Sequence, residues 1–257
     1  MNDLLSTLGL TQLARALPHV LDDARTQQLS YDAFLRTALQ VEVTGRQQRA
    51  LERRLRAARL PLRARLDTFD FRFQPTVSER LIRELASLRF IDTATNVILL
   101  GPPGVGKTHL VSALAVQAIE AGHTARFTTL SQLVTALGDI PHPSLWRQRL
   151  RRYVQPKVLV IDEVGYTRLT SDQAQQLFEL VTARYERGPI LLTSNLTFAE
   201  WGVLLGDDVL ATALLDRLLH HAEVMAINGR SYRMRDRMLG DTQLTEHNNG
   251  GQILSAI

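Results

Sequence analysis

A glycine-rich segment at residues 101–108 contains the first residues whose types and spacing could do chemistry. It consists of Gly101, Pro102, Pro103, Gly104, Val105, Gly106, Lys107 and Thr108, and this order matches the pattern G-x-x-x-x-G-K-[ST]. In that pattern backbone N–H groups surround a phosphate, the lysine adds positive charge and the threonine hydroxyl can ligate Mg²⁺. The alternative is a glycine-rich turn that binds nothing. An apolar run before the segment and a helical pattern after it favour phosphate binding, and His109, the next residue, is a further candidate contact.

Two carboxylates, Asp162 and Glu163, directly follow the apolar run 158–161. An apolar strand that ends in two acids is hard to explain by packing, and ligands bind at the carboxyl ends of parallel strands. We therefore expect Asp162, together with Thr108, to hold Mg²⁺ and its waters. Glu163 is expected to act as the general base that takes a proton from an attacking water.

A third polar cluster, Thr193, Ser194 and Asn195, follows the apolar run 190–192. Thr193 or Asn195 could position the attacking water. The alternative is that Ser194 and Asn195 cap the turn into the next segment, which is a common use of these residues. Because the cluster follows two motifs of a phosphate site, we favour a role in that site.

These motifs require a scaffold that brings the ends of several strands together. From residue 96 onward, short apolar runs alternate with segments of helical period. The expected strands are 97–100, 125–130, 158–161, 190–193 and 224–227, and the expected helices are 108–121, 131–137, 144–154, 171–187 and 207–221. This alternation predicts an α/β fold with a central parallel sheet that helices cover on both faces.

The sequence before residue 96 has a different character. Residues 1–66 read as a small all-helical domain, whose third helix begins at Tyr31 or Glu42 and stops at Pro61. Residues 67–95 contain a polar and aromatic linker and a short helix over 78–88. Residues 96–237 form the α/β domain, and the polar segment 238–257 is expected to be a mobile tail.

Arginines dominate residues 43–66, where Glu52 is the one acid. On a helix, the four arginines Arg46, Arg49, Arg53 and Arg56 fall within one narrow stripe. The simpler interpretation is a solvated face. A stripe of like charge repels itself unless a polyanion neutralises it, so we expect these arginines to contact DNA phosphates without sequence preference.

A second basic cluster, over residues 146–157, contains no acidic residue. Its candidate DNA-binding residues are Arg147, Arg149, Arg151 and Arg152. The cluster precedes the run that carries Asp162, so it could couple DNA contact to the phosphate site. The alternative is that Trp146, Leu150 and Tyr153 pack while the arginines are solvated, and the sequence leaves both interpretations open.

The composition fits a folded cytoplasmic protein. The chain has 257 residues, of which 45% are hydrophobic and 22% charged, and a net charge of +4. The absence of cysteine excludes disulfides and cysteine-ligated zinc. No apolar run approaches the roughly 20 residues that span a bilayer, and the start of the chain does not read as a signal peptide. The seven histidines show no metal-ligand spacing with acidic partners, and we interpret them as structural or surface residues.

Seven segments carry a resemblance to a known family. They are GKTHL at 106–110, IDEVGY at 161–166, RYE at 184–186, TSN at 193–195, WG at 201–202, LDRLLH at 215–220 and SYR at 231–233. Together they resemble the IstB-like transposition helper ATPases, which are AAA+ proteins related to the DnaC helicase loaders. The resemblance covers about residues 1–237 and implies an AAA+ P-loop fold that binds ATP and Mg²⁺ and hydrolyses ATP.

The resemblance also implies roles that the bare sequence does not indicate. Asn195 corresponds to the sensor 1 residue, and Arg217 corresponds to the arginine finger that completes a neighbouring subunit's site. The protein is therefore expected to act as a homo-oligomer with ATP sites at subunit interfaces. Without the resemblance, Arg217 would be read as a solvated helix residue or a partner of Asp216. Arg233 or Arg235 could serve as sensor 2, although too few residues follow them for a full AAA+ lid.

The expected function is that of an accessory ATPase of DNA transposition. Such a protein would assemble on duplex target DNA with ATP and stimulate a separate transposase. The alternative is a DnaC-type loader whose N-terminal helices grip a replicative helicase. A third, non-enzymatic interpretation is a nucleotide-gated DNA clamp, against which the presence of Glu163 argues.

Overall fold

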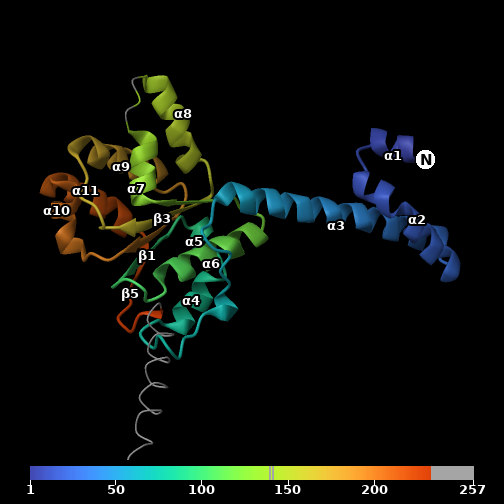
Figure 1. Ribbon diagram of the computed structural model, residues 1–257, viewed down its shortest axis with the longest axis horizontal. Coiled ribbons are helices and arrows are strands. Elements are labelled where there is room, and N and C mark those ends of the chain that lie inside the picture. Colours follow the sequence, from blue (N-terminus) through green and yellow to red (C-terminus); the bar gives the residue numbers. More distant parts are fainter. Residues whose placement is uncertain (139, 141, 233–257) are drawn as a thin grey trace, which may run out of the picture. The chain divides into compact units, whose positions relative to one another are not determined.

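The computed structural model describes residues 1–138, 140 and 142–232 (Figure 1). The chain divides into two compact units, Met1–Ala57 and Ala58–Ile257. The helical first unit thus ends earlier than the expected boundary at residue 66, and the linker segment 67–95 belongs to the unit that contains the sheet. Within the described residues, no helix is long and apolar enough to cross a membrane.

Three helices make up the first unit, and they are α1 (Asn2–Thr7), α2 (Thr11–Thr26) and α3 (Tyr31–Ala58). α3 begins at the earlier of the two expected positions and is one continuous helix of 28 residues. The hydroxyl oxygen of Ser30 accepts a hydrogen bond from the backbone N–H of Ala33 and so supports the start of α3. A small apolar core of Leu5, Leu13, Val20 and Ala38 joins the three helices.

The second unit is built on a five-stranded parallel sheet. Its strands are β1 (Asn96–Leu100), β2 (Ala125–Thr129), β3 (Val158–Val164), β4 (Ile190–Ser194) and β5 (Ala222–Ala226), in the order β2-β3-β4-β1-β5. Every neighbouring pair is parallel, which confirms the predicted α/β sheet. Because β4 lies between β1 and β3, the carboxyl ends of these three strands meet at one edge of the sheet.

Helices flank this sheet in the order that the sequence predicted (Figure 1). The longer ones are α6 (Lys107–Glu120), α7 (Leu130–Leu137), α8 (Pro143–Val154), α9 (Ser171–Arg184) and α11 (Asp208–Leu219). The shorter ones are α4 (Glu79–Leu85), α5 (Arg89–Asp92) and α10 (Trp201–Leu205), with 3-10 turns at Leu66–Thr68 and Phe198–Glu200. α5 and α10 were not predicted, because segments of four and five residues are too short to show a helical period.

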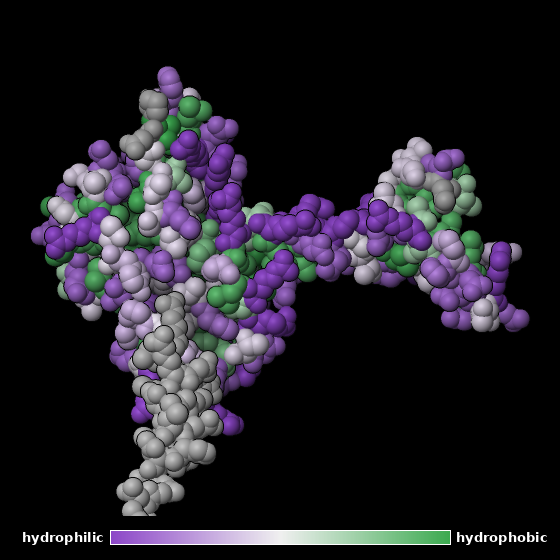
Figure 2. Space-filling view, in the orientation of Figure 1, coloured by the Kyte–Doolittle hydropathy of each residue, from purple (hydrophilic) through white to green (hydrophobic). Residues whose placement is uncertain are grey.

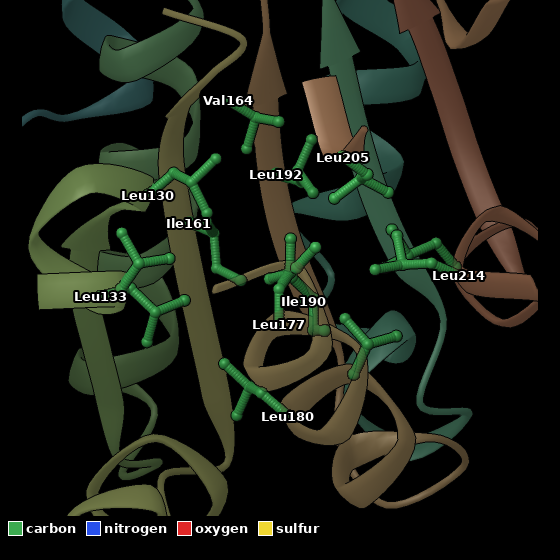
Figure 3. Packing of buried hydrophobic residues seen from close by; sticks show 14 of the residues in the cluster. Leu130, Leu133, Ile161, Val164, Leu177, Leu180, Ile190, Leu192, Leu205 and Leu214 are labelled. Atoms are coloured by element: carbon green, nitrogen blue, oxygen red, sulfur yellow. The ribbon is translucent and has the colours of Figure 1, made fainter. Parts of the chain in front are cut away.

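A large apolar cluster covers one face of the sheet. Ile161 of β3 and Leu192 of β4 belong to this cluster with Leu177 and Leu180 of α9 (Figure 3). Burying a side chain of this size stabilises a fold by about 1.5–3 kcal/mol. The cluster therefore fixes β3 and β4 firmly against α9, and these are the strands that carry the predicted carboxylates and the polar cluster after residue 192.

Candidate nucleotide-binding site

The glycine-rich loop connects β1 to α6, as its motif requires. Gly104 and Gly106 have φ angles of 83° and 99°, which L side chains rarely adopt. A Cβ on Gly104 would lie 2.0 Å from Oγ of Ser231, and a Cβ on Gly106 would lie 2.7 Å from the ring of Phe69. The loop thus needs glycine both for its curled backbone and for the close approach of neighbouring segments.

Lys107 begins α6 and points back across the loop. Its Nζ donates hydrogen bonds to the carbonyl oxygens of Gly101, at 2.5 Å, and Pro102, at 2.8 Å. The side chain is buried, so its charge is held inside the loop rather than in bulk solvent. A buried ammonium at this position offers positive charge to a phosphate bound by the loop.

Thr108, Asp162 and Thr193 form a hydrogen-bonded chain across three elements. Oγ1 of Thr108 lies 3.1 Å and 2.9 Å from the two carboxylate oxygens of Asp162. The hydroxyl of Thr193 donates a hydrogen bond to the same carboxylate and accepts one from the backbone N–H of Glu163 at 3.1 Å. The structure therefore brings together the predicted metal ligands and ties them to β4.

Glu163 is exposed although it belongs to β3. Its φ angle is 62°, and the register between β3 and β4 shifts between Ile161 and Val164. A left-handed conformation costs a residue with a side chain about 1–2 kcal/mol, and strained residues cluster at functional sites. The irregularity turns the Glu163 side chain toward the same cleft as Asp162, which is where a general base would have to lie.

Asn195 follows β4 and lies beside this carboxylate pair. Its Oδ1 atom is buried and has no hydrogen-bond partner in the described part of the chain. A Cβ on Gly165 would lie 2.5 Å from this oxygen, so the glycine leaves room for the amide. A buried acceptor without a partner calls for a water or a ligand. The placement of an attacking water by Asn195 stays a prediction.

A cleft of about 340 Å³ joins these groups. Phe69 from the linker and Tyr232 from the segment after β5 line it as well, and their ring centroids lie 5.9 Å apart. Nε2 of His109 lies 3.0 Å from the carbonyl oxygen of Arg65 and 3.3 Å from the hydroxyl of Thr68. His109 thus contacts both the cleft and the linker.

The sequence analysis did not assign Phe69 or Tyr232 to the site. Their place in it depends on contacts over long sequence separations, such as the hydrogen bond of 2.6 Å from the Tyr232 hydroxyl to the carbonyl oxygen of Asp70. In the sequence, the one signal that pointed to Tyr232 was the SYR segment at 231–233, which is part of the family resemblance.

These residues fit a nucleotide with Mg²⁺. Thr108 and Asp162 present oxygen atoms, which are the ligands that Mg²⁺ prefers. Lys107 and the curled glycine backbone offer positive charge and N–H groups to phosphates, and the orphan oxygen of Asn195 fits a water. The arrangement can bind a triphosphate and activate a water against it.

Arg217 is not among the residues that line the cleft of its own chain. It lies near the end of α11, where Nη1 donates to the carbonyl oxygen of Ala213 at 3.0 Å. Its guanidinium carbon lies 4.6 Å from the centroid of the Phe178 ring. Within the described residues, no ion pair joins Arg217 to Asp216. Arg217 is half-buried, so it is not the fully solvated helix residue of the simpler interpretation.

The structure contradicts the expectation that the arginines of α3 lack acidic partners, because Glu42 pairs with two of them. Its carboxylate is buried and accepts hydrogen bonds from the backbone N–H groups of Gln12 at 2.7 Å and Leu13 at 3.0 Å. It also pairs with Arg46 at 3.0 Å and Arg49 at 3.2 Å. The hydrogen bond from Leu13, together with those from Arg46 and Gln12, lowers the pKa of Glu42 to about 2.

Acidic residues of α3 itself therefore neutralise part of the charge of the arginine stripe. Arg56 pairs with Glu52 at 3.4 Å, while Arg53 is exposed. Hydrophilic residues still cover much of the visible surface of α3 (Figure 2). The premise of uncompensated charge is wrong for Arg46 and Arg49, because their acidic partner, Glu42, lies one residue before the arginine-rich segment 43–66. DNA contact by this stripe stays a prediction.

The second basic cluster lies on α8 of the sheet unit. Its four candidate arginines, Arg147, Arg149, Arg151 and Arg152, are exposed. Tyr153 is buried, whereas Trp146 and Leu150 are partly buried, so packing by the apolar residues and exposure of the arginines occur together. Burial, and then the charges of Arg59 and Arg152, lower the pKa of Arg126. Positive charge from Arg59 and Arg152 thus acts on Arg126, a residue that the sequence analysis did not include.

Two expectations fall on residues outside the described part of the chain. These are the sensor 2 candidates Arg233 and Arg235 and the tail 238–257. The histidines were expected to be structural or surface residues, because their spacing along the sequence shows no metal-ligand pattern. In the structure, Glu186 lies close enough to His220 and His221 for the three to hold a metal ion, although the sequence separates it from them.

Fold and cleft together define the class of protein. A parallel sheet of this order, with a glycine-rich loop after β1 and the Asp162 carboxylate on β3 beside that loop, is an AAA+ type P-loop fold. The chain matches the family described as "IstB-like ATP binding protein" over residues 3–240 and belongs to that family.

Two curated relatives come from bacterial insertion sequences. The chain is 45% identical over 234 residues to the ATP-binding protein of insertion sequence IS21 from Pseudomonas aeruginosa, which covers 91% of this chain and 88% of the relative. It is 44% identical over 232 residues to that of insertion sequence IS5376 from Geobacillus stearothermophilus, covering 90% and 92%. The crystal structure of the DnaC helicase loader is similar in fold, with a TM-score of 0.52, 24% identity, and coverage of 64% of this chain and 96% of that one.

Proposed function

We propose that this protein is a Mg²⁺-dependent ATPase that assists DNA transposition. The observation that carries the proposal is the chain of hydrogen bonds from Thr108 through Asp162 to Thr193, next to a phosphate-binding loop. A buried network of this kind has no evident purpose in packing, and it presents metal ligands at the ligand-binding edge of the sheet. The relatives, named for insertion sequences, support transposition as the setting.

The candidate site residues have distinct tasks in ATP hydrolysis. The loop backbone and Lys107 bind the phosphates, and Thr108 and Asp162 hold Mg²⁺, which when bound offsets the charge on the phosphate oxygens. Asn195 positions a water with its unpaired oxygen. Glu163 takes the proton from this water as it attacks the γ-phosphate.

Arg217 acts on the site of a neighbouring subunit. It lies outside the cleft of its own chain, yet its guanidinium is half-exposed near the end of α11. A fixed positive charge delivered by a second copy would stabilise the transition state. Hydrolysis then requires a homo-oligomer, in which ATP sites lie at subunit interfaces.

Duplex DNA is the partner that the basic surfaces fit. The exposed arginines of α8 and the partly neutralised arginines of α3 offer charge to phosphates rather than to particular bases. In this proposal the protein assembles on target DNA in the cytoplasm and stimulates a separate transposase. The DnaC-type helicase loader remains an outcome of the test, since the likeness to DnaC is one of fold alone.

The decisive experiment measures the ATPase rate of the full chain with and without duplex DNA. We expect stimulation that grows with protein concentration and is lost in Lys107→Ala, Glu163→Gln and Arg217→Ala. Arg80→Ala on α4 changes an exposed arginine and serves as the control. A rate indifferent to duplex DNA would favour the helicase loader, and full activity in Arg217→Ala would exclude that residue from the site.

A further inference from the structure

Three potential metal ligands gather at a corner of the sheet unit that is separate from the nucleotide cleft. Glu186 lies in the loop between α9 and β4, and His220 and His221 connect α11 to β5. One ligand atom from each residue lies within 4.8 Å of the other two, and all three side chains are exposed. None of them lines the nucleotide cleft. A metal ion from solution can therefore reach all three at once.

The backbone on the Glu186 side of this corner is held rigidly. Arg184 is buried and donates hydrogen bonds to five carbonyl oxygens, those of Tyr153, Val154, Pro156, Lys157 and Pro189, at 2.9–3.0 Å. Glu186 itself has a φ angle of 56°, a left-handed conformation that is strained for a glutamate. The anchor at Arg184 and this turn fix the direction of the Glu186 side chain.

The histidine side is anchored to neighbouring elements as well. The carbonyl oxygen of His221 accepts a hydrogen bond of 2.8 Å from the backbone N–H of Asn96, where β1 begins. The backbone N–H of His220 donates a hydrogen bond of 3.0 Å to the backbone carbonyl oxygen of Asp216, in the last turn of α11. The two imidazole rings stack with centroids 4.3 Å apart. The two imidazoles are thus held side by side.

Tyr185 orients one of the two imidazoles. Its hydroxyl is hydrogen-bonded to Nδ1 of His220. Because Nδ1 is engaged in this hydrogen bond, Nε2 is the ring nitrogen of His220 that is available to a metal ion. Metal-bound histidines commonly make such a hydrogen bond through the second ring nitrogen.

We propose that Glu186, His220 and His221 bind a divalent zinc-class metal ion. Two imidazole nitrogens, one carboxylate oxygen and a water complete the four-coordinate geometry that Zn²⁺ adopts. Mg²⁺ and Ca²⁺ are excluded because they require mostly oxygen ligands. This site goes beyond the proposed ATPase, since it uses none of the residues assigned to nucleotide or to Mg²⁺.

The bound ion would join two parts of the fold that the chain separates. Glu186 lies after the end of α9, and His220 directly follows α11, so one ion would tie the end of α9 to the end of α11. Arg217 lies three residues before His220 and lines the same small pocket as Glu186 and His221. Metal binding would therefore make the end of α11 more rigid at the helix turn that carries Arg217.

The test measures metal binding to the full, tag-free chain in the absence of nucleotide. Co²⁺ serves as a spectroscopic probe because its visible absorption reports four-coordination, and Zn²⁺ titration calorimetry gives stoichiometry and affinity. We expect one ion per chain, with affinity lowered at least tenfold by Glu186→Gln, His220→Ala and His221→Ala. Tyr185→Phe should weaken binding by about 10–100-fold, since it removes the partner of a ligand without removing the ligand.

Matched controls separate this site from other metal contacts. His19→Ala and His142→Ala remove exposed histidines elsewhere and should leave Zn²⁺ affinity unchanged, as should Lys107→Ala in the nucleotide cleft. Equal binding by the parent and by the His220→Ala/His221→Ala double variant would overturn the proposal. So would the absence of saturable binding below about 100 μM Zn²⁺. All readouts are metal-binding signals, so their outcome does not depend on whether the protein hydrolyses ATP.

Discussion

The hydroxyl of Thr108 lies 2.9 Å and 3.1 Å from the two carboxylate oxygens of Asp162. These residues are 54 positions apart in the sequence, yet they meet because α6 starts beside the carboxyl end of β3. Asp162 is almost fully buried, and a buried carboxylate needs such partners. The pair is therefore positioned before any metal binds, and this preorganisation leads to the first prediction.

Asp162→Asn and Thr108→Val should each raise the Mg²⁺ concentration at which ATP hydrolysis is half-maximal, by about 10–100-fold. The first removes the negative charge and the second removes the hydroxyl, with little change in volume. Thr108→Ser keeps the hydroxyl and should behave like the parent. Mg²⁺ titrations of the ATPase rate at saturating ATP measure the effect. An unchanged midpoint in both variants would mean that this pair does not hold the metal ion.

Glu163→Gln should lower kcat by about 10²–10⁴-fold, which is the usual contribution of a general base. The amide cannot accept a proton from water, but it keeps the shape and the polar contacts of the carboxylate. The affinity for ATP should therefore stay within a factor of about three, because the phosphates bind to other residues. Single-turnover kinetics and a fluorescent ATP analogue separate the two quantities. Glu179→Gln, on the exposed side of α9, is the control.

Glu42 provides a pH-dependent contribution to the stability of the first unit. Its pKa of about 2 in the folded state lies below the ordinary value near 4.5. A carboxylate whose folded pKa is depressed stabilises the fold above its unfolded pKa, and this stabilisation is lost as pH falls through the folded pKa. We therefore expect Glu42→Gln to destabilise the first unit at pH 7, with a difference from the parent that shrinks between about pH 4.5 and pH 2.

Helix content of the full chain during urea unfolding, followed across this pH range, measures that difference. Glu52→Gln removes a half-buried acid whose partner Arg56 is exposed, so its effect should be small at every pH. A Glu42→Gln variant as stable as the parent at pH 7 would contradict the prediction.

Arg184 should be one of the most sensitive positions for stability. Its guanidinium donates to five carbonyl oxygens at the base of the loops before β3 and β4, and burial lowers its pKa to about 10, so it remains charged at neutral pH. Arg184→Met would leave buried carbonyl groups without donors, each at about 1–3 kcal/mol, so a total loss of about 3 kcal/mol or more is expected. Denaturant unfolding measures it. Arg187→Met changes an exposed neighbour and should have little effect.

The meeting of the glycine-rich loop with the two acids of β3 could be predicted from the sequence because its signals are local. The loop at 101–108 and the acids after 161 each combine an apolar run with a motif of fixed spacing, and the parallel sheet then brings them together. Partners that depend on tertiary contacts could not be predicted. Glu42 bonds to residues about 30 positions away, and Glu186 approaches His220 only because α9 and α11 end at the same corner. Residue spacing along the chain does not contain that information.

The exposed arginines of α8 should determine how the affinity for duplex DNA depends on salt. Each arginine that contacts a phosphate releases counterions, so removing it should reduce the slope of log K against log [salt] by about one. We expect this for Arg147→Ala, Arg151→Ala and Arg152→Ala, with a similar loss for unrelated DNA sequences because phosphates carry no sequence information. Arg36→Ala, which removes an exposed arginine paired with Asp32, is the control. Fluorescence anisotropy over a range of salt concentrations gives the slopes, and unchanged slopes in all three variants would exclude α8 from the DNA contact.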